Sequence, residues 1–259
     1  MRLFAAKIAL GPVLLLQGRR VRRVALRLPE AAGPRHGELG TGPQPLRLLL
    51  VGDSATAGVG AAVQREALAG QLSGRLHDRL DRRRLQWRLV ARSGVDTAQA
   101  LEMLDAAWAD GGEALRADVA IVGLGVNDVT GQVPIARWLR TLDVLVERLV
   151  HRHGARRVVI SGLPPVHRFP ALPQPLRWYL GACARRYDRA LREWARGRSG
   201  VLVPVFPPVT DPSMMASDGF HPGPGGYRVW AEALAGVIEQ ALADDDGASG
   251  ILADLQRSA

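Results

Sequence analysis

Apolar and polar residues form two kinds of pattern along this chain. Five short runs are almost continuously apolar and rich in Leu, Val and Ile, which is typical of strands buried in a sheet; they cover residues 46–51, 86–91, 118–124, 157–161 and 201–205. Between the runs, apolar residues recur every third or fourth position, as on one face of a helix. Strands that alternate with helices predict an α/β domain whose parallel sheet is covered on both faces.

Cap residues and prolines mark where several of these helices begin. A leucine repeat starts at Leu68, and we expect Asp96 or Thr97 to cap the next helix. Pro134 and Pro224 each stand just before an apolar stripe, where a first-turn proline is favoured.

The single cysteine, Cys183, lies on another helical stripe, so we expect it to pack in the core. One cysteine excludes an internal disulfide and a cysteine-cluster metal site.

The first 45 residues differ from the rest of the chain. The apolar stretch 8–16, which Pro12 interrupts, is too short to span a bilayer, and arginines at 19–23 follow it where a secretory signal would have its cleavage site. We therefore expect a cytoplasmic protein. Residues 1–25 are open to two interpretations: a helix packed on the domain, or an amphipathic segment that contacts an anionic membrane.

Composition also divides the chain into three parts. Residues 29–45, rich in Pro, Gly and Glu, are expected to form a linker at the end of an N-terminal region that spans residues 1–45. The domain is expected to cover residues 46–244, and residues 245–259 to form a C-terminal tail.

A formal charge of +9 on 259 residues raises the question of a nucleic-acid partner. The basic residues are spread along the helical segments, and aromatic residues make up only 5%, which leaves few platforms for stacked bases. We therefore expect a solvated, arginine-rich surface and no nucleic-acid partner. The oligomeric state is not predicted.

Polar residues follow the strands at the sheet edge where α/β proteins gather their chemistry. Ser54 follows the first strand, and we expect it at a tight turn that begins a helix, whose free N–H groups would face an oxyanion. Asp53 or Ser54 as an ordinary helix cap is the alternative. Gly94 follows the second strand, where a backbone N–H can approach a substrate or a turn simply needs glycine.

Two later blocks add an amide and a base. Asn127 follows the third strand and offers a neutral donor for an oxyanion, although an Asn-Asp turn explains it equally well. Asp218 and His221 are close enough in a turn for the carboxylate to hold one imidazole nitrogen while the other faces a nucleophile. A purely structural Asp-His turn would account for only this one block.

Taken together, the ordered blocks resemble the GDSL, or SGNH, hydrolase family. The matching residues are Gly52-Asp53-Ser54, Gly94, Gly125-Val126-Asn127-Asp128 and Asp218-Gly219-Phe220-His221-Pro222, and the resemblance covers residues 46–242. It implies a flavodoxin-like three-layer α/β/α sandwich with a five-stranded parallel sheet. Ala55 stands where the family's name has leucine, a departure that leaves the chemistry intact.

The resemblance also implies roles for individual residues. Ser54 would be the nucleophile, His221 its base and Asp218 the partner of that base. The backbone N–H groups of Ser54 and Gly94 and the side-chain amide of Asn127 would be the oxyanion donors. The implied function is a serine esterase or lipase that cleaves a small-molecule carboxylic ester or thioester through an acyl-enzyme.

Other functions remain open beside this one. A carbohydrate O-acetylesterase or an acyltransferase would use the same site. A basic module that binds membrane or nucleic acid without catalysis is a more distant alternative, because it leaves the four blocks unexplained.

An apolar, proline-rich segment, residues 163–173, follows the fourth strand and is expected to line the acyl pocket. We expect Asp53, Phe169, Trp178 and Tyr179 to contact the substrate, which favours a lipid-like or aromatic acyl group. The alternative is a rigid connecting loop, with Trp178 and Tyr179 packed in the core.

Neither a metal nor a cofactor is expected. His167 has no ligand partner at a suitable spacing, and His151 and His153 end a helix near Arg152, where solvated positive groups are expected. The stretch Gly58-Val59-Gly60 lacks the further glycine and the acidic residue of a dinucleotide site.

Overall fold

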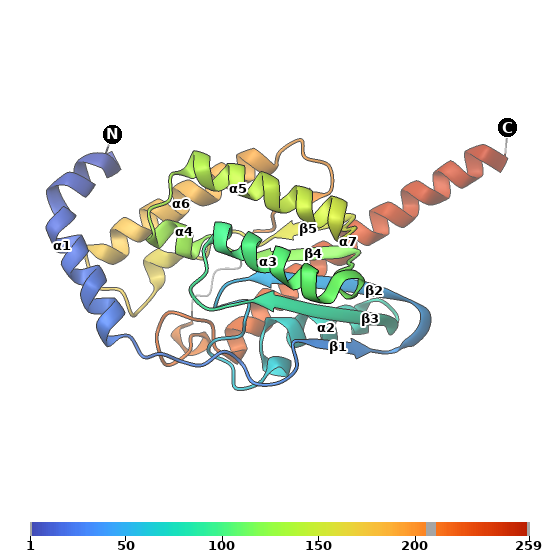
Figure 1. Ribbon diagram of the computed structural model, residues 1–259, viewed down its shortest axis with the longest axis horizontal. Coiled ribbons are helices and arrows are strands. Elements are labelled where there is room, and N and C mark those ends of the chain that lie inside the picture. The colour runs from blue at the N-terminus through green and yellow to red at the C-terminus, as the bar shows by residue number, and fades with distance from the viewer. Residues whose placement is uncertain (1, 206–210, 258–259) are drawn as a thin grey trace.

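A twisted sheet lies between two layers of helices (Figure 1). The computed structural model describes residues 2–205 and 211–257, without the side chains of residues 2, 4, 5, 212 and 246–257. Within those residues the sheet has six strands, namely β1 (His36–Leu39), β2 (Thr41–Gly52), β3 (Arg83–Ala91), β4 (Val119–Gly123), β5 (Arg157–Ile160) and β6 (Val201–Leu202).

The strand order is β1-β3-β2-β4-β5-β6, and every neighbouring pair is parallel except β1 with β3. The five parallel strands have the flavodoxin-like order. The chain runs from β2 to β3 on one side and then crosses to β4 on the other side, so the switch point lies between β2 and β4. The expected fold class is therefore confirmed. A ligand site is expected at the carboxyl end of β2.

Alternate residues of the central strands face opposite layers, as the two-residue period of a strand requires. Leu48 and Leu50 of β2 pack against one group of helices, whereas Leu49 and Val51 pack against the other. Both faces of the sheet are thus buried, which explains why the strand sequences are continuously apolar.

The helices form the outer layers. The longer ones are α1 (Arg2–Val24), α2 (Leu68–Arg79), α3 (Thr97–Gly111), α5 (Ile135–Glu147), α6 (Leu176–Ala195) and α7 (Pro224–Arg257). Asp96 caps α3 in a capping box with Gln99, as the sequence predicts. Cys183 of α6 is buried in the core. Helix α7 continues through residue 245, where a tail was expected to begin.

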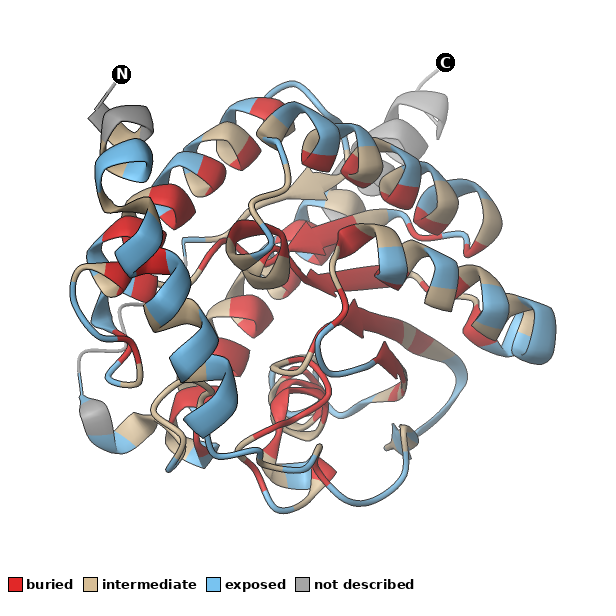
Figure 2. Ribbon diagram, turned by 60° about the vertical axis from the view of Figure 1, so that its left-hand side comes forward, coloured by how far each residue is buried: buried red, intermediate tan, exposed pale blue. Residues whose placement is uncertain are grey.

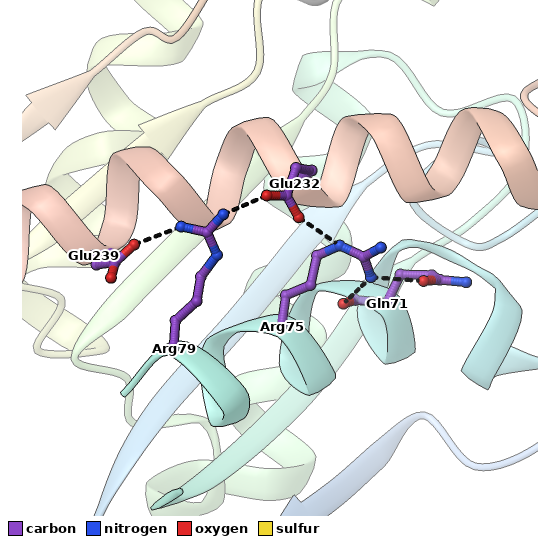
Figure 3. A network of polar contacts seen from close by, with 5 residues as sticks. All are labelled: Gln71, Arg75, Arg79, Glu232 and Glu239. Carbon is purple, nitrogen blue, oxygen red and sulfur yellow. Dashed lines mark hydrogen bonds and ion pairs between the residues drawn. The ribbon is translucent and has the colours of Figure 1, made fainter. Parts of the chain in front are cut away.

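Helices α2 and α7 cover the same face of the sheet and are linked along their outer sides (Figure 3). Glu232 of α7 accepts a hydrogen bond from Nε of Arg75 at 2.9 Å and pairs with Arg79, which also donates to Glu239 at 2.6 Å. These groups are partly exposed, so their contribution to stability is small beside that of the buried leucines.

The segment expected to be a linker contains regular structure. Residues 36–39 form β1, which pairs antiparallel with β3, and β2 begins at Thr41 rather than at residue 46. An edge strand can be short and polar because only one of its sides needs a partner and one of its faces can meet solvent. The sheet therefore has one antiparallel strand more than the five parallel strands that were expected.

The N-terminal helix packs on α6 through one face. Leu14 is buried there, and Leu10 and Val21 are partly buried against the same core. No helix in the described part of the chain is long and apolar enough to cross a bilayer.

The expectation of solvated histidines at the end of α5 is wrong for His153. His151 is exposed, but His153 is fully buried, with Nδ1 3.0 Å from the carbonyl oxygen of Leu115 and its ring against the edge of Trp108. Burial lowers the pKa of His153, because a charged imidazolium would be poorly solvated there.

Candidate active site

The turn that carries Ser54 follows the carboxyl end of β2. Thr56 turns back under this end and donates its hydroxyl hydrogen to the carbonyl oxygen of Gly123, at 3.1 Å. A Cβ on Gly52 would lie 2.1 Å from Oγ1 of Thr56, and one on Gly123 would lie 2.2 Å from it. Glycine is therefore required at the ends of both strands, since Thr56 fills the space that side chains would take.

The structure differs from expectation immediately after Ser54. Residues 54–60 form consecutive turns, and the next long helix, α2, begins only at Leu68. Gly58 and Gly60 have φ values of +90° and +99°, which a right-handed helix does not tolerate. The expected helix N-terminus beside the serine is therefore absent from this part of the structure, and Ser54 lies in a turn.

Ser54, His221 and Asp218 form one line of contacts. Oγ of Ser54 is 2.8 Å from Nε2 of His221, and Nδ1 of His221 is 2.6 Å from Oδ2 of Asp218. Because an ionised carboxylate only accepts hydrogen bonds, Nδ1 carries the proton and Nε2 is free to accept from the serine hydroxyl. Residues that are 167 positions apart in the chain thus meet at hydrogen-bonding distance.

The Asp218 carboxylate is held by its own turn. Its Oδ1 accepts hydrogen bonds from the backbone N–H groups of Phe220 and His221, at 2.9 and 3.0 Å. Burial alone would raise the pKa of Asp218, but the hydrogen bonds from the His221 side chain and from these backbone groups outweigh it and lower that pKa. Asp218 therefore stays ionised and fixes the orientation of the imidazole.

Asp53 is a second buried carboxyl at the site. Its Oδ1 accepts a hydrogen bond from the N–H of Ala55 at 3.1 Å, and its side chain lies beside Asn127. Burial raises the pKa of Asp53 to about 6, against the opposing effects of the Ala55 hydrogen bond and of the nearby His221.

Two links hold the Gly94 turn against Asn127. Nδ2 of Asn127 donates to the carbonyl oxygen of Val95 at 2.9 Å, and the carboxylate of Asp128 accepts from the Thr97 hydroxyl at 2.7 Å. The other Nδ2 hydrogen has only a long contact to Asp53, at 3.5 Å, and stays available. Gly94 itself is exposed in this turn with a φ of +82°.

The first turns of α7 join the loops that form the site. Tyr227 donates from its hydroxyl to the carbonyl oxygens of Ala55 and Val59, at 2.9 and 2.6 Å, which fastens the turn that contains Ser54. Trp230 donates from Nε1 to the hydroxyl of Ser161, at 2.9 Å, where β5 ends. The helix that follows His221 thus positions the nucleophile candidate as well as the base candidate.

A cavity of about 320 Å³ opens beside Ser54 and His221. Its lining also includes Asp53 and Asn127, and most of its wall is apolar, from Leu124, Val126, Pro164, Pro165, Phe169, Pro170, Met215, Phe220 and Trp230. Arg168 adds a cation and Asp211 a carboxylate to this lining. Such an apolar cavity with a few convergent polar groups is typical of a small-molecule site.

Two residues expected at the substrate do not line this cavity. Trp178 is 45% exposed on α6, and Tyr179 is buried in the core with its hydroxyl bonded to Gln132 at 2.7 Å. Helix α6 begins at Leu176, so its first turn carries these two aromatic rings away from the loop that reaches the site. Of the three aromatic residues expected there, only Phe169 reaches the cavity wall.

Several residues that build the site were not predicted from the sequence. Ser161 ends a strand just as Ser54 does, so the rule that indicated Ser54 also applied to it. Tyr227 and Trp230 fit an ordinary apolar stripe, and nothing in their spacing distinguishes a hydroxyl or an indole N–H that bonds to a loop far away in sequence.

Comparison with known proteins identifies a family that matches most of this chain. Residues 50–229 match the model of the family described as the GDSL-like lipase/acylhydrolase family. A curated relative, the GDSL-like esterase Rv1075c of Mycobacterium tuberculosis, is 27% identical over 209 residues, which cover 78% of this chain. The chain spans 64% of the length of that relative.

Solved structures share the fold at low sequence identity. The lipase Lip_vut3 from a goat rumen metagenome has a TM-score of 0.60 and 18% identity, over 73% of this chain and 95% of its own. The psychrotrophic esterase EstA from Pseudoalteromonas sp. has a TM-score of 0.56 and 17% identity, over 76% of this chain and 98% of its own.

Proposed function

This chain belongs to the GDSL-like lipase/acylhydrolase family, and from that premise we propose that it is a serine hydrolase of carboxylic esters or thioesters. The observation that carries the proposal is the line of contacts from Ser54 through His221 to Asp218 at the mouth of an apolar cavity. A nucleophile, a base and a group that orients the base are the parts that such catalysis needs.

The proposed reaction has two stages. His221 accepts the proton of Ser54 at Nε2 while Oγ attacks the carbonyl carbon, and the same proton then passes to the departing alcohol or thiol. Water, deprotonated by His221, attacks the acyl-enzyme and releases the acid and the free serine. Asp218 stabilises the imidazolium in both stages without taking its proton.

The oxyanion would be held by three donors. These are the backbone N–H groups of Ser54 and Gly94 and the free Nδ2 hydrogen of Asn127. Support for Gly94 comes from the two links that hold its turn, from Asn127 to Val95 and from Asp128 to Thr97. Donors fixed in this way need little reorganisation when negative charge develops.

The cavity wall favours a lipid-like or small acyl group. Phe169 and the neighbouring prolines give an apolar surface that an acyl chain can cover, and most of the wall is apolar, which suits an acyl chain better than a sugar. We therefore expect turnover of p-nitrophenyl esters to rise from acetate to longer chains. A maximum at acetate, together with activity on acetylated sugars, would show the carbohydrate acetylesterase instead.

A phosphonate probe tests the nucleophile. Oγ of Ser54 should displace fluoride from an alkyl fluorophosphonate, which adds the phosphonyl mass to one tryptic peptide and abolishes esterase activity. Ser54→Ala should prevent both labelling and activity, and His221→Ala should slow both. Ser199→Ala, in an exposed turn, is the matched control and should behave as wild type. Full activity in Ser54→Ala would refute the proposal.

Hydrolysis and acyl transfer share the acyl-enzyme, so they are separated by what attacks it. Turnover in mixtures of water and a short alcohol, with the free acid and the new ester measured separately, gives the partition directly. We expect the free acid to dominate.

A further inference from the structure

The outward face of α1 is apolar in its first half and basic in its second. Ile8, Leu15 and Leu16 are 66%, 61% and 66% exposed, respectively. Arg19 and Arg23 follow on the same face at helical spacing, with Arg22 beside them, and all three are exposed. Figure 2 shows this outward side of α1 largely in the colour of exposed residues.

This exposure is not the result of a loosely placed helix. The opposite face of α1 is packed on α6 through Leu14, and two hydrogen bonds fix it. Gln17 donates from Nε2 to the carbonyl oxygen of Gln174 at 2.7 Å, and its Oε1 accepts from the N–H of Leu176 at 3.1 Å. The outward face is therefore a second apolar surface, and Ile8, Leu15 and Leu16 on it do not pack against the domain.

The charge of this surface is of one sign. Residues 1–29 contain seven basic residues and no acidic one, since the first carboxylate of the chain is Glu30. In the described part of the chain, none of Arg19, Arg22 and Arg23 has an ion-pair partner. Unpaired arginines next to large exposed aliphatic side chains attract a partner that is both anionic and apolar.

We propose that this face of α1 docks onto an anionic lipid bilayer. The aliphatic half would enter the boundary between head groups and acyl chains, and the arginine half would lie among the phosphates. A nucleic acid would satisfy the arginines but would leave Ile8, Leu15 and Leu16 in water. The lipid surface covers both halves of the face.

Docking would also set the position of the cavity. The loop that includes Pro164 and Phe169 lines the cavity and leads to Gln174, which α1 contacts through Gln17. Helix α1 lies at the end of the molecule toward which the parallel strands point, the end that carries Ser54 (Figure 1). A docked molecule would therefore hold the cavity close to the lipid surface.

Vesicle binding of the full chain tests the proposal. We expect sedimentation with phosphatidylcholine vesicles that contain about 30% phosphatidylglycerol, weaker binding to pure phosphatidylcholine, and release by salt because the attraction is screened. The Arg19→Gln/Arg22→Gln/Arg23→Gln variant should lower the partition coefficient on the order of 100-fold. Leu15→Gln/Leu16→Gln should lower it roughly tenfold or more.

The matched control removes the same kind of charge elsewhere. Arg82→Gln/Arg83→Gln alters two exposed arginines at the amino end of β3, at the other end of the sheet from α1. We expect this pair to bind within about twofold of wild type. An equal loss in the control, no binding by wild type, or binding to DNA with none to anionic vesicles would each overturn the proposal.

A fluorescence measurement tests whether α1 contacts the lipid, and it does not depend on catalysis. Tryptophan placed by Leu15→Trp should shift its emission to the blue on anionic vesicles and be quenched by brominated acyl chains, and unchanged emission would refute docking through this face. The same vesicle measurements on Ser54→Ala should match wild type. A failure of the serine hydrolase mechanism would therefore leave this result intact, and the reverse also holds.

Discussion

Asp53 is a buried carboxyl whose raised pKa makes the stability of the fold depend on pH. With a pKa of about 6, against an ordinary value of 3.8, the folded state favours the protonated carboxyl. Its contribution to stability is therefore complete below the unfolded pKa and is lost as the pH rises through about 6.

The change Asp53→Asn should remove this pH dependence. Asparagine does not titrate, so the stability advantage of wild type over the variant should be roughly 1 kcal/mol smaller at pH 8 than at pH 5. Urea unfolding at the two pH values measures the difference. Asp78→Asn, on the exposed side of α2, is the matched control. A difference that is the same at both pH values would contradict the account of Asp53.

One side-chain N–H of Asn127 has a long contact to Asp53, at 3.5 Å, and is the proposed oxyanion donor. Asn127→Ala removes the proposed oxyanion donor and should lower kcat by about 10²- to 10³-fold. KM should change little, because the interaction strengthens only as the charge develops. Steady-state kinetics with a p-nitrophenyl ester, beside a thermal melt showing that the variant is folded, measures this. A rate within a factor of two of wild type would exclude Asn127 from the oxyanion site.

At the scale of elements, one buried network joins the start of α3 to α4 (Val126–Thr130). The Thr97 hydroxyl donates to Asp128 at 2.7 Å and accepts from Nε1 of Trp138 on α5 at 3.0 Å. All three side chains are buried, so a lost partner cannot be replaced by water without cost.

Replacement of Thr97 by valine should show how much this hydrogen-bond network contributes to stability. Thr97→Val keeps the shape but leaves the indole N–H of Trp138 unpaired, so we expect a loss of about 1–3 kcal/mol in the free energy of unfolding. In a Trp138→Phe background the same change should cost about 1 kcal/mol less, since no indole N–H remains. Urea unfolding followed by circular dichroism gives both values. Equal costs in the two backgrounds would mean that this hydrogen bond adds nothing.

The elements differ in how far the sequence could predict them. Continuous apolar runs identified the five parallel strands, because a strand that is buried on both faces needs apolar side chains at successive positions. The same signal could not reveal β1, whose residues are polar and whose place depends on pairing with β3. The turns after Ser54 were mistaken for a helix start because small residues suit both, and the difference depends on positive φ values at Gly58 and Gly60.

The residues that the structure brings together at the candidate site could be predicted where a suitable residue type stands at the end of a strand or before the last helix. A serine, an asparagine and an Asp-His pair stand at strand ends or before the last helix, and the parallel topology brings such positions together. The expectation that Trp178 and Tyr179 contact the substrate could not be checked from sequence, because the direction of their side chains depends on where α6 begins. The proline-rich segment before α6 does not specify that residue. Tyr227 of α7 holds the turn that contains Ser54 through contacts that exist only in the folded chain.

The whole molecule carries a net charge of +9, and its field extends beyond any single contact. Arg168 lies at the cavity wall, and no ion-pair partner for it is found in the described part of the chain. Asp211 adds a carboxylate to the lining of the same cavity, and the lowered pKa of Asp211 keeps it ionised. An anionic ester should therefore be attracted by the net charge of the molecule as a whole, with Arg168 as the cation at the wall that offsets Asp211, whereas a neutral ester should not be attracted.

We expect this field to appear as a salt dependence that only charged substrates show. Between about 20 mM and 200 mM salt, kcat/KM for a carboxylate-bearing p-nitrophenyl ester should fall roughly threefold or more, and the value for the neutral ester of equal length should stay nearly constant. Arg168→Gln should reduce the preference for the anionic ester without altering the neutral one, whereas Arg82→Gln, at the amino end of β3, should not. If both esters responded equally to salt, the effect would lie in the protein itself, because attraction of the substrate acts only on a charge that the substrate carries.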